Sequence, residues 1–302
     1  MAQMTDDSVA AVHMRAGLAL ALVSAATFAL SGALARGLID TGWSPGAVVL
    51  ARIAIAALAL APFAARALRG RWGLLRRNAR VVLLYGAVPV AGTQFAYFSA
   101  VAAMDVAPAL LIEYTAPAVI VAWLWLRHGE RPRPMTLAGA GIAAVGLVLV
   151  LDLLSGADLA LDGVLWALAA MLGAATYFVM SADTRHGVPP LALAGGGLAV
   201  GAIGLGALAV VGVLPMRAST ASPTYAGEAV AWWLPFLGLG VVTAAIAYTT
   251  GIAASRRLGS RLASFVALLV VVVKLAERPP RADAADPRAV RAPSRPITAP
   301  GS

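Results

Sequence analysis

The sequence of 302 residues has no cysteine, and only 12% of its residues are charged. Without cysteine the chain forms neither disulfide bridges nor cysteine-based zinc sites, which excludes a secreted disulfide scaffold and thiol redox chemistry. Lysine is almost absent as well, because Lys274 is the only one. The formal net charge of +9 therefore comes from arginine, and its meaning depends on where the arginines lie.

Apolar residues make up 61% of the chain, and the mean hydropathy is +0.85. Such a composition predicts an all-α polytopic membrane protein rather than a soluble domain. The last of nine apolar runs, Leu262 to Val273, is short for a span. The first run is too long for a signal peptide, so we expect it to remain as a membrane helix. Eight longer apolar runs predict membrane helices near residues 16–38, 46–65, 81–101, 107–126, 135–151, 162–181, 190–214 and 231–254.

Most arginines before the C-terminal tail fall in alternate loops, whereas the other loops hold only Arg36 and Arg217. Basic residues in short loops resist translocation, so this pattern predicts a multi-pass protein of the plasma membrane, the cell inner membrane, with its N-terminus in the cytoplasm. The arginine run from Arg66 to Arg80 then lies in a short inner loop. We interpret it as a contact with anionic lipid headgroups and not with nucleic acid.

Two short patterns recur about 150 residues apart, in the same order of helices. Ala25-Ala26-Thr27-Phe28 recurs as Ala174-Ala175-Thr176-Tyr177, and Ala96-Tyr97 recurs as Ala247-Tyr248. This spacing carries the first predicted helix onto the sixth and the third onto the eighth. A unit of five helices has an odd number of spans, so its second copy inserts upside down. The sequence therefore predicts the inverted-repeat architecture of many secondary transporters.

Three stretches carry a resemblance to a known family: Tyr97-Phe98-Ser99-Ala100-Val101-Ala102-Ala103, Pro108-Ala109-Leu110-Leu111-Ile112-Glu113-Tyr114-Thr115-Ala116-Pro117 and Gly129-Glu130-Arg131-Pro132. Together they resemble the signature of EamA-type carriers in the drug/metabolite transporter (DMT) superfamily, over roughly residues 16–275. The resemblance implies two five-helix repeats in ten spans. It also implies proton- or gradient-driven efflux of small metabolites or drugs, without an ATPase module. We expect neither a cofactor nor enzyme activity.

The C-terminal region departs from that pattern. Glu277-Arg278-Pro279 repeats Glu130-Arg131-Pro132, so we expect the ninth helix to end there, about one turn short. Residues 278–302 are rich in Arg, Pro and Ala and are expected to be disordered, with no tenth helix. The hypothesis is a truncation or frameshift that leaves about nine spans. A truncated, non-transporting membrane protein thus stays an alternative to a carrier.

These observations divide the chain into four parts. We expect a cytoplasmic N-terminus over 1–15, a first five-helix repeat over 16–152, an incomplete second repeat of four helices over 162–277, and the tail over 278–302. The expected partners are a small-molecule substrate, protons and membrane lipids, and a homodimer stays open.

Two ionisable residues, Arg52 and Glu113, fall inside predicted spans, each roughly 10 Å from the outer helix end. We expect both to line a central polar cavity, where Glu113 exchanges a proton and Arg52 holds an anionic substrate group or neutralises Glu113. The alternative is that Arg52 snorkels to the outer headgroups or forms only a structural ion pair. Four polar side chains are further candidates for the pathway, with ordinary interhelical hydrogen bonding as their alternative: Ser31, Gln94, Tyr97 and Tyr248.

The histidines do not support a metal site or a catalytic triad. His13, His128 and His186 lie far apart in the sequence and have no carboxylates clustered around them. A polytopic membrane enzyme would need acids, histidines or metal ligands gathered at one membrane face. The sequence shows no such gathering, so a membrane enzyme is less favoured than a carrier.

Overall fold

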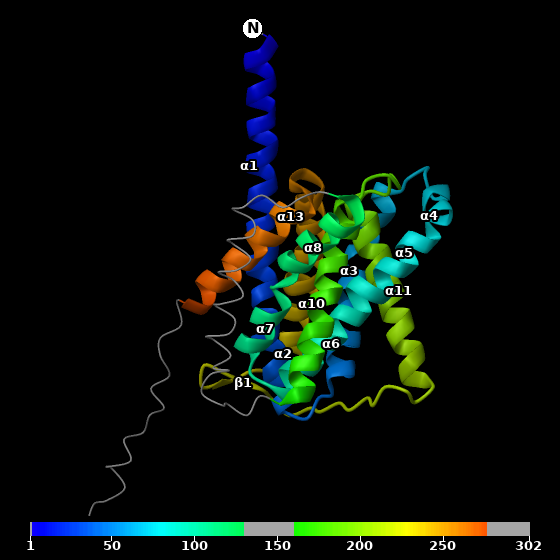
Figure 1. Ribbon diagram of the computed structural model, residues 1–302. Coiled ribbons are helices and arrows are strands. Elements are labelled where there is room, and N and C mark those ends of the chain that lie inside the picture. The colour runs from blue at the N-terminus through cyan, green and yellow to red at the C-terminus, as the bar shows by residue number, and fades with distance from the viewer. Residues whose placement is uncertain (1, 130–159, 277–302) are drawn as a thin grey trace, which may run out of the picture.

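A computed structural model describes residues 2–129 and 160–276 as a bundle of long helices (Figure 1). Before the gap the chain forms α1 (Ala2–Ala29), α2 (Ser31–Asp40), α3 (Pro45–Ala67), α4 (Gly73–Arg77), α5 (Ala79–Tyr85), α6 (Thr93–Ala103), α7 (Val106–Glu113) and α8 (Ala116–His128). After the gap it forms α10 (Leu161–Ala182), α11 (Pro190–Val210), α12 (Trp233–Leu237) and α13 (Ala247–Ala276). Two π-helical segments, η1 (Gly86–Gly92) and η2 (Gly238–Ile246), join α5 to α6 and α12 to α13, and β1 (Thr224–Tyr225) pairs antiparallel with β2 (Glu228–Ala229).

Seven segments of the described chain are long and apolar enough to cross a membrane, which confirms a mainly helical, polytopic membrane protein. They match the predicted first to fourth and sixth to eighth helices. The predicted fifth helix over 135–151 and the tail over 278–302 lie outside the described residues. The seven segments are Val12–Asp40, Pro45–Ala67, Ala79–Ala103, Val106–Arg127, Leu161–Ala182, Pro190–Val210 and Trp233–Val270.

Local sequence signals set where several helices begin and turn. Helix α3 begins behind Ser44, whose hydroxyl accepts a hydrogen bond from the backbone N–H of Ala47 at 3.3 Å, and Pro45 occupies the first helical position. Within α13 the chain turns at Gly259, whose φ of 77° suits a residue without a side chain. The segment after Gly259 is the predicted ninth helix, and it runs back past α1 (Figure 1).

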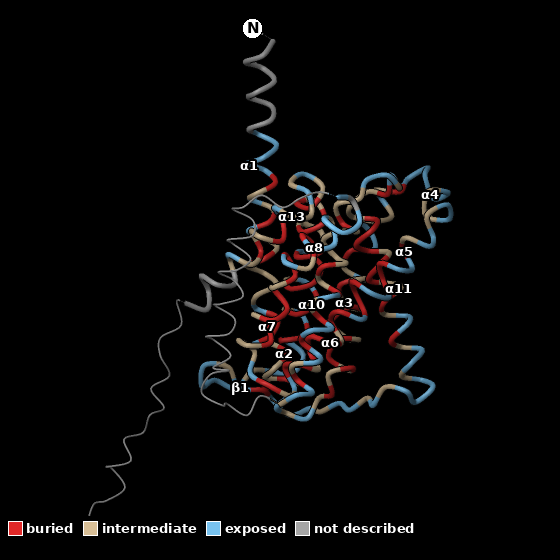
Figure 2. The backbone as a smooth tube through the Cα atoms, in the orientation of Figure 1, coloured by how far each residue is buried: buried red, intermediate tan, exposed pale blue. Residues whose placement is uncertain are grey.

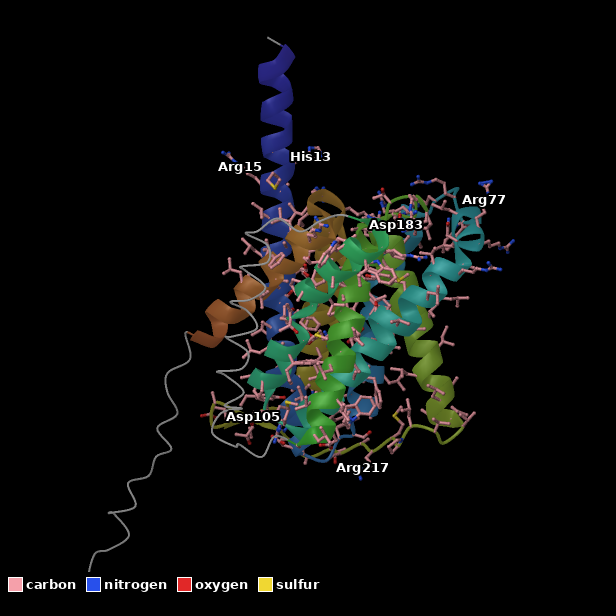
Figure 3. All side chains as sticks on the ribbon, viewed as in Figure 1. His13, Arg15, Arg77, Asp105, Asp183 and Arg217 are labelled. Carbon is pink, nitrogen blue, oxygen red and sulfur yellow. The ribbon has the colours of Figure 1, made fainter. Side chains whose placement is uncertain are left out.

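The two ends of the bundle differ in the side chains they carry. Arg15 and Arg77 lie at one end, which we call the arginine end, whereas Asp105 and Arg217 lie at the opposite end (Figure 3). The chain alternates between these ends in the predicted order. That the arginine end faces the cytoplasm stays a prediction.

Buried and exposed residues are distributed as expected for a bundle in lipid. Small and apolar side chains fill the interior, whereas the outer helix surfaces are less buried (Figure 2). Large apolar side chains such as Leu58, Leu126 and Ile203 are more than 70% exposed, at 74%, 85% and 73%. Many exposed side chains of this kind would favour association in water, but they suit contact with acyl chains.

The helices of the two halves pack in matching pairs. Helix α1 packs against α13, and α6 packs against α10; η2 contacts α3, and η1 contacts α11. The sequence spacing of about 150 residues relates α1 to α10, α3 to α11, η1 to η2, and α6 to the first part of α13. When the two halves are exchanged, the α1–α13 contact therefore becomes the α10–α6 contact, and the α3–η2 contact becomes the α11–η1 contact. Helices α1 and α3 also run through the bundle in directions opposite to α10 and α11 (Figure 1).

Candidate functional site

A cavity lies inside the bundle and is lined by helices of both halves. Its volume is about 70 Å³. Small residues, mainly alanine, form much of its wall. The polar and aromatic side chains that line it are Ser24, Phe28, Thr93, Gln94, Glu113, Tyr114, Tyr177, Phe178, Tyr248 and Ser264.

Glu113 lies where the fourth span is interrupted. Helix α7 ends at this residue because Pro117, four residues later, has no N–H to donate to the Glu113 carbonyl. The side chain is only 2% exposed and lines the cavity. Its Oε2 atom has no hydrogen-bond partner among the described residues. The carboxyl group therefore has an acceptor atom that no described residue uses.

A hydrogen-bond chain joins the two halves beside Glu113. The Tyr248 hydroxyl donates to the Pro89 carbonyl at 3.0 Å, and the Gln94 side-chain nitrogen donates to the Tyr248 oxygen at 2.9 Å. A carbonyl can only accept, so the single Tyr248 proton goes to Pro89 and the amide group of Gln94 has to present its nitrogen. The Oε1 atom of Gln94 is left without a partner in the described part of the chain.

The two π-helical segments flank this region. Segment η1 contains Pro89, which lacks the N–H of a regular helix, and η2 lies about 150 residues later in the corresponding helix. Each segment has a main-chain carbonyl that accepts from a side chain of another helix: Pro89 from Tyr248, and Thr243 from Arg52. These bonds stabilise the irregular backbone at the middle of the bundle.

Arg52 is fully buried but does not line the cavity. Its Nη2 atom donates to the Thr243 carbonyl at 2.6 Å, and its guanidinium carbon lies 5.3 Å and 5.2 Å from the ring centres of Phe28 and Phe98. We call Arg52, Phe98 and Thr243 the Arg52 cluster. Full burial is incompatible with snorkelling to the headgroups. Nor do Arg52 and Glu113, both within the described part of the chain, form an ion pair with each other; Arg36–Asp40 and Arg185–Asp183 are examples of ion pairs that do form.

The other predicted site residues separate into two groups. Gln94 and Tyr248 line the cavity together with Glu113. Ser31 and Tyr97 are buried outside its lining, between α2 and α6, where the Tyr97 hydroxyl closely approaches Gly32. Ser31 follows the lining residue Phe28, and Tyr97 follows the lining residue Gln94, in segments that run toward the opposite end (Figure 1). By chain order these two residues, and Phe98 of the Arg52 cluster, therefore come after the cavity on the way to that end.

The sequence interpretation missed the aromatic lining, although a signal for it was present. Phe28 and Tyr177 hold the same position in the recurring Ala-Ala-Thr-aromatic pattern, and both line the cavity. The ring of Tyr177 lies 5.4 Å from that of Tyr248 in an edge-to-face arrangement. Aromatic residues at equivalent repeat positions would have identified this wall.

The cavity has no arrangement suited to a metal. Within residues 2–129 and 160–276, no three His, Cys, Asp or Glu side chains gather closely enough to hold an ion. Its lining offers instead one carboxylate, one amide oxygen and several aromatic rings, which together suit a small organic molecule.

Comparison with known proteins bears on the first half of the chain and on the fold. Residues 15–152 match the EamA-like transporter family, which confirms the resemblance seen in the sequence over that range. No curated protein matches the chain. It is similar to a solved structure named "Crystal structure of protein", with a TM-score of 0.62 and 24% identity, over 88% of this chain and 87% of that one. This likeness shows the fold alone.

Proposed function

Because residues 15–152 belong to the EamA-like transporter family, we propose that the protein is a secondary active transporter that exports small metabolites or drugs by alternating access. The observation that carries the proposal is the cavity between the two halves, with the Glu113 carboxyl group in its wall. A buried carboxylate within a membrane costs about 3 kcal/mol on insertion scales. A static bundle would gain nothing in return for that cost.

The proposed architecture is a pair of inverted five-helix repeats over 16–152 and 162–277. It is supported by sequence patterns about 150 residues apart, by helices that run in opposite directions, and by helix contacts that persist when the halves are exchanged. The presence of η1 and η2 in corresponding helices adds to this support. In such a structure the two halves can exchange conformations and open the same cavity to either side.

Access from the opposite end requires movement in the Arg52 cluster. The bond from Arg52 to the Thr243 carbonyl joins the first half to the second on that side of the cavity. Phe28 borders both the cavity and the Arg52 guanidinium, so it forms a partition between them. We expect this layer to separate when the cavity opens toward the opposite end.

Glu113 is the proposed proton-exchange site. The other carboxylates within the described spans, Asp40 and Asp162, lie at helix ends. Glu113 alone among them borders the cavity, so its protonation changes the charge that a substrate meets there.

The absence of cysteine makes a direct test possible, because single cysteines can be introduced without removing any others. Ser31→Cys reports on the opposite-end side of the cavity, and Ala21→Cys reports on the cavity wall in α1. In proteoliposomes with an imposed pH gradient, a carrier shifts the labelling of the two positions by an impermeant maleimide in opposite directions. A non-transporting protein leaves both labelling rates constant, which would contradict the proposal.

A flux measurement complements the labelling. Amphipathic amino acids, nucleosides and drugs are added to vesicles that hold a pH-sensitive dye, and a transported solute collapses the gradient. We expect Glu113→Gln to slow this collapse at least about tenfold. The matched control is Asp162→Asn, an exposed carboxylate at a helix end, which should leave the rate unchanged.

A further inference from the structure

Five side chains in the cavity wall already use a hydrogen-bond donor within the protein. Ser24 donates to the Ala247 carbonyl at 2.8 Å, and Thr93 donates to the Val88 carbonyl at 3.0 Å. Ser264 donates to the Arg261 carbonyl at 2.8 Å. The Tyr248 hydroxyl and the Gln94 nitrogen are used in the chain that ends at the Pro89 carbonyl. The other side-chain donors in the wall are the hydroxyl groups of Tyr114 and Tyr177.

Two acceptor atoms, in contrast, have no partner within the described part of the chain. Glu113 Oε2 and Gln94 Oε1 belong to side chains only 2% and 1% exposed, and neither atom has a partner among the described residues. Both side chains line the same cavity. Buried polar atoms without partners are unfavourable, so they favour a ligand or water that brings N–H or O–H groups.

The remainder of the wall is aromatic and apolar. The rings of Phe28, Tyr114, Tyr177, Phe178 and Tyr248 border the cavity. An aromatic face attracts a cation through its quadrupole, and the attraction increases where water is excluded. A carboxylate beside several rings is a combination that suits a positively charged group on an apolar body.

The cavity does not suit an anion, which needs positively charged groups around it. No arginine, lysine or histidine lies among the described residues that line the cavity. Arg52, the nearest candidate, lies outside the lining and donates to Thr243, even though its Nε and Nη1 atoms lack partners among the described residues. An anion in the cavity would instead lie beside the Glu113 carboxylate and be repelled.

From this inventory we propose that the cavity takes a small organic cation, an ammonium group on an aromatic or aliphatic body. The ammonium donates to Glu113 and to the Gln94 oxygen, and the body packs against the rings of Tyr177 and Tyr248. This substrate class rests on the proposed transport function. It replaces the expected role of Arg52 as a holder of anionic groups with recognition of positive charge by Glu113.

Three probes of nearly equal shape and different charge test the class. The full-length protein in detergent is titrated calorimetrically with 2-phenylethylammonium, 2-phenylethanol and phenylacetate. We expect the ammonium to bind at least about tenfold more tightly than the alcohol, and phenylacetate not to bind. Equal binding of the alcohol or the anion, or no binding of the ammonium, would overturn the proposal.

Variants locate the contact. Glu113→Gln should weaken ammonium binding at least about tenfold and leave the alcohol unchanged, whereas Asp162→Asn should change neither. Tyr177→Phe keeps the ring and should retain binding, but Tyr177→Leu should weaken it several-fold. This second pair keeps the test decisive if Glu113→Gln does not fold. Unchanged ammonium binding in both Glu113→Gln and Tyr177→Leu would contradict the assignment.

The outcome for transport is read separately. If the cysteines at positions 31 and 21 exchange accessibility while 2-phenylethylammonium fails to bind, the cation class is wrong and the carrier function stands. If the ammonium binds and accessibility never changes, the ligand class stands and the carrier function is wrong.

Discussion

Two adjacent regions inside the bundle hold the buried charges of the described residues, and they differ in what surrounds each charge. Glu113 borders the cavity and keeps one oxygen without a partner in the described chain. Arg52, in the neighbouring Arg52 cluster, donates to a main-chain carbonyl and lies against two aromatic rings. A buried charged side chain can thus line a cavity where a ligand binds, or it can hold two helices together by a hydrogen bond. The degree of burial alone does not distinguish these two roles.

The strongest way to break this comparison is to neutralise Glu113. Glu113→Gln removes a buried charge that has no ion-pair partner among the described residues, so we expect thermal stability to be retained or raised while flux falls at least about tenfold. Unfolding temperature and flux are measured on the same preparation. A loss of stability with unchanged flux would mean that Glu113, like Arg52, serves to attach helices to one another.

Neutralising Arg52 should have the reverse profile. Arg52→Met leaves the Thr243 carbonyl without its charged donor, and we expect a loss of about 2 kcal/mol in unfolding free energy. Labelling of Ser31→Cys from the opposite end should rise in this background, because the connection between the halves is weakened. Arg77→Met, at an exposed position, is the control. Unchanged stability and labelling would contradict the role of the Arg52 cluster.

The close contact between η1 and α11 can be compared with an open position elsewhere on α11. A Cβ atom at Gly86 would lie 2.7 Å from the Gly197 carbonyl oxygen, so Gly86→Ala should destabilise by about 1–3 kcal/mol. At Gly204 nothing lies within 4 Å, and Gly204→Ala should stabilise by about 0.5 kcal/mol. Denaturation of both variants measures the difference in their unfolding free energies. Equal effects would show that the contact between η1 and α11 is not tightly packed.

The smallest effect is expected outside the membrane, at Asp183. Arg185 donates to this carboxylate at 2.7 Å and lowers the pKa of Asp183 to about 2. The stabilisation is present above the unfolded pKa of about 3.9 and is lost as the pH falls toward 2. Solvent screens the pair, so Asp183→Asn should cost at most about 0.5 kcal/mol at pH 7 and leave flux unchanged. A larger loss would show that the loop between α10 and α11 contributes more to stability than the exposure of its side chains indicates.

Part of the candidate site followed from the sequence. Depth along each predicted helix put Arg52, Glu113, Gln94 and Ser31 in one layer, and three of the six candidate residues line one cavity. Depth is a single coordinate and says nothing of the direction in which a side chain points around its helix. Arg52 therefore shared the layer without sharing the cavity, and the recurring aromatic residues were overlooked.

By itself the sequence determined the seven spans that the structure describes and their order, because a membrane helix needs about 20 apolar residues in one continuous stretch and that requirement is local. It also indicated two related halves, because an internal similarity is visible in the letters. Only the tertiary structure decided which buried groups meet. Whether Glu113 faces a cavity and Arg52 a carbonyl depends on helix rotation, on the breaks at Pro89 and Pro117, and on packing between residues far apart in the chain.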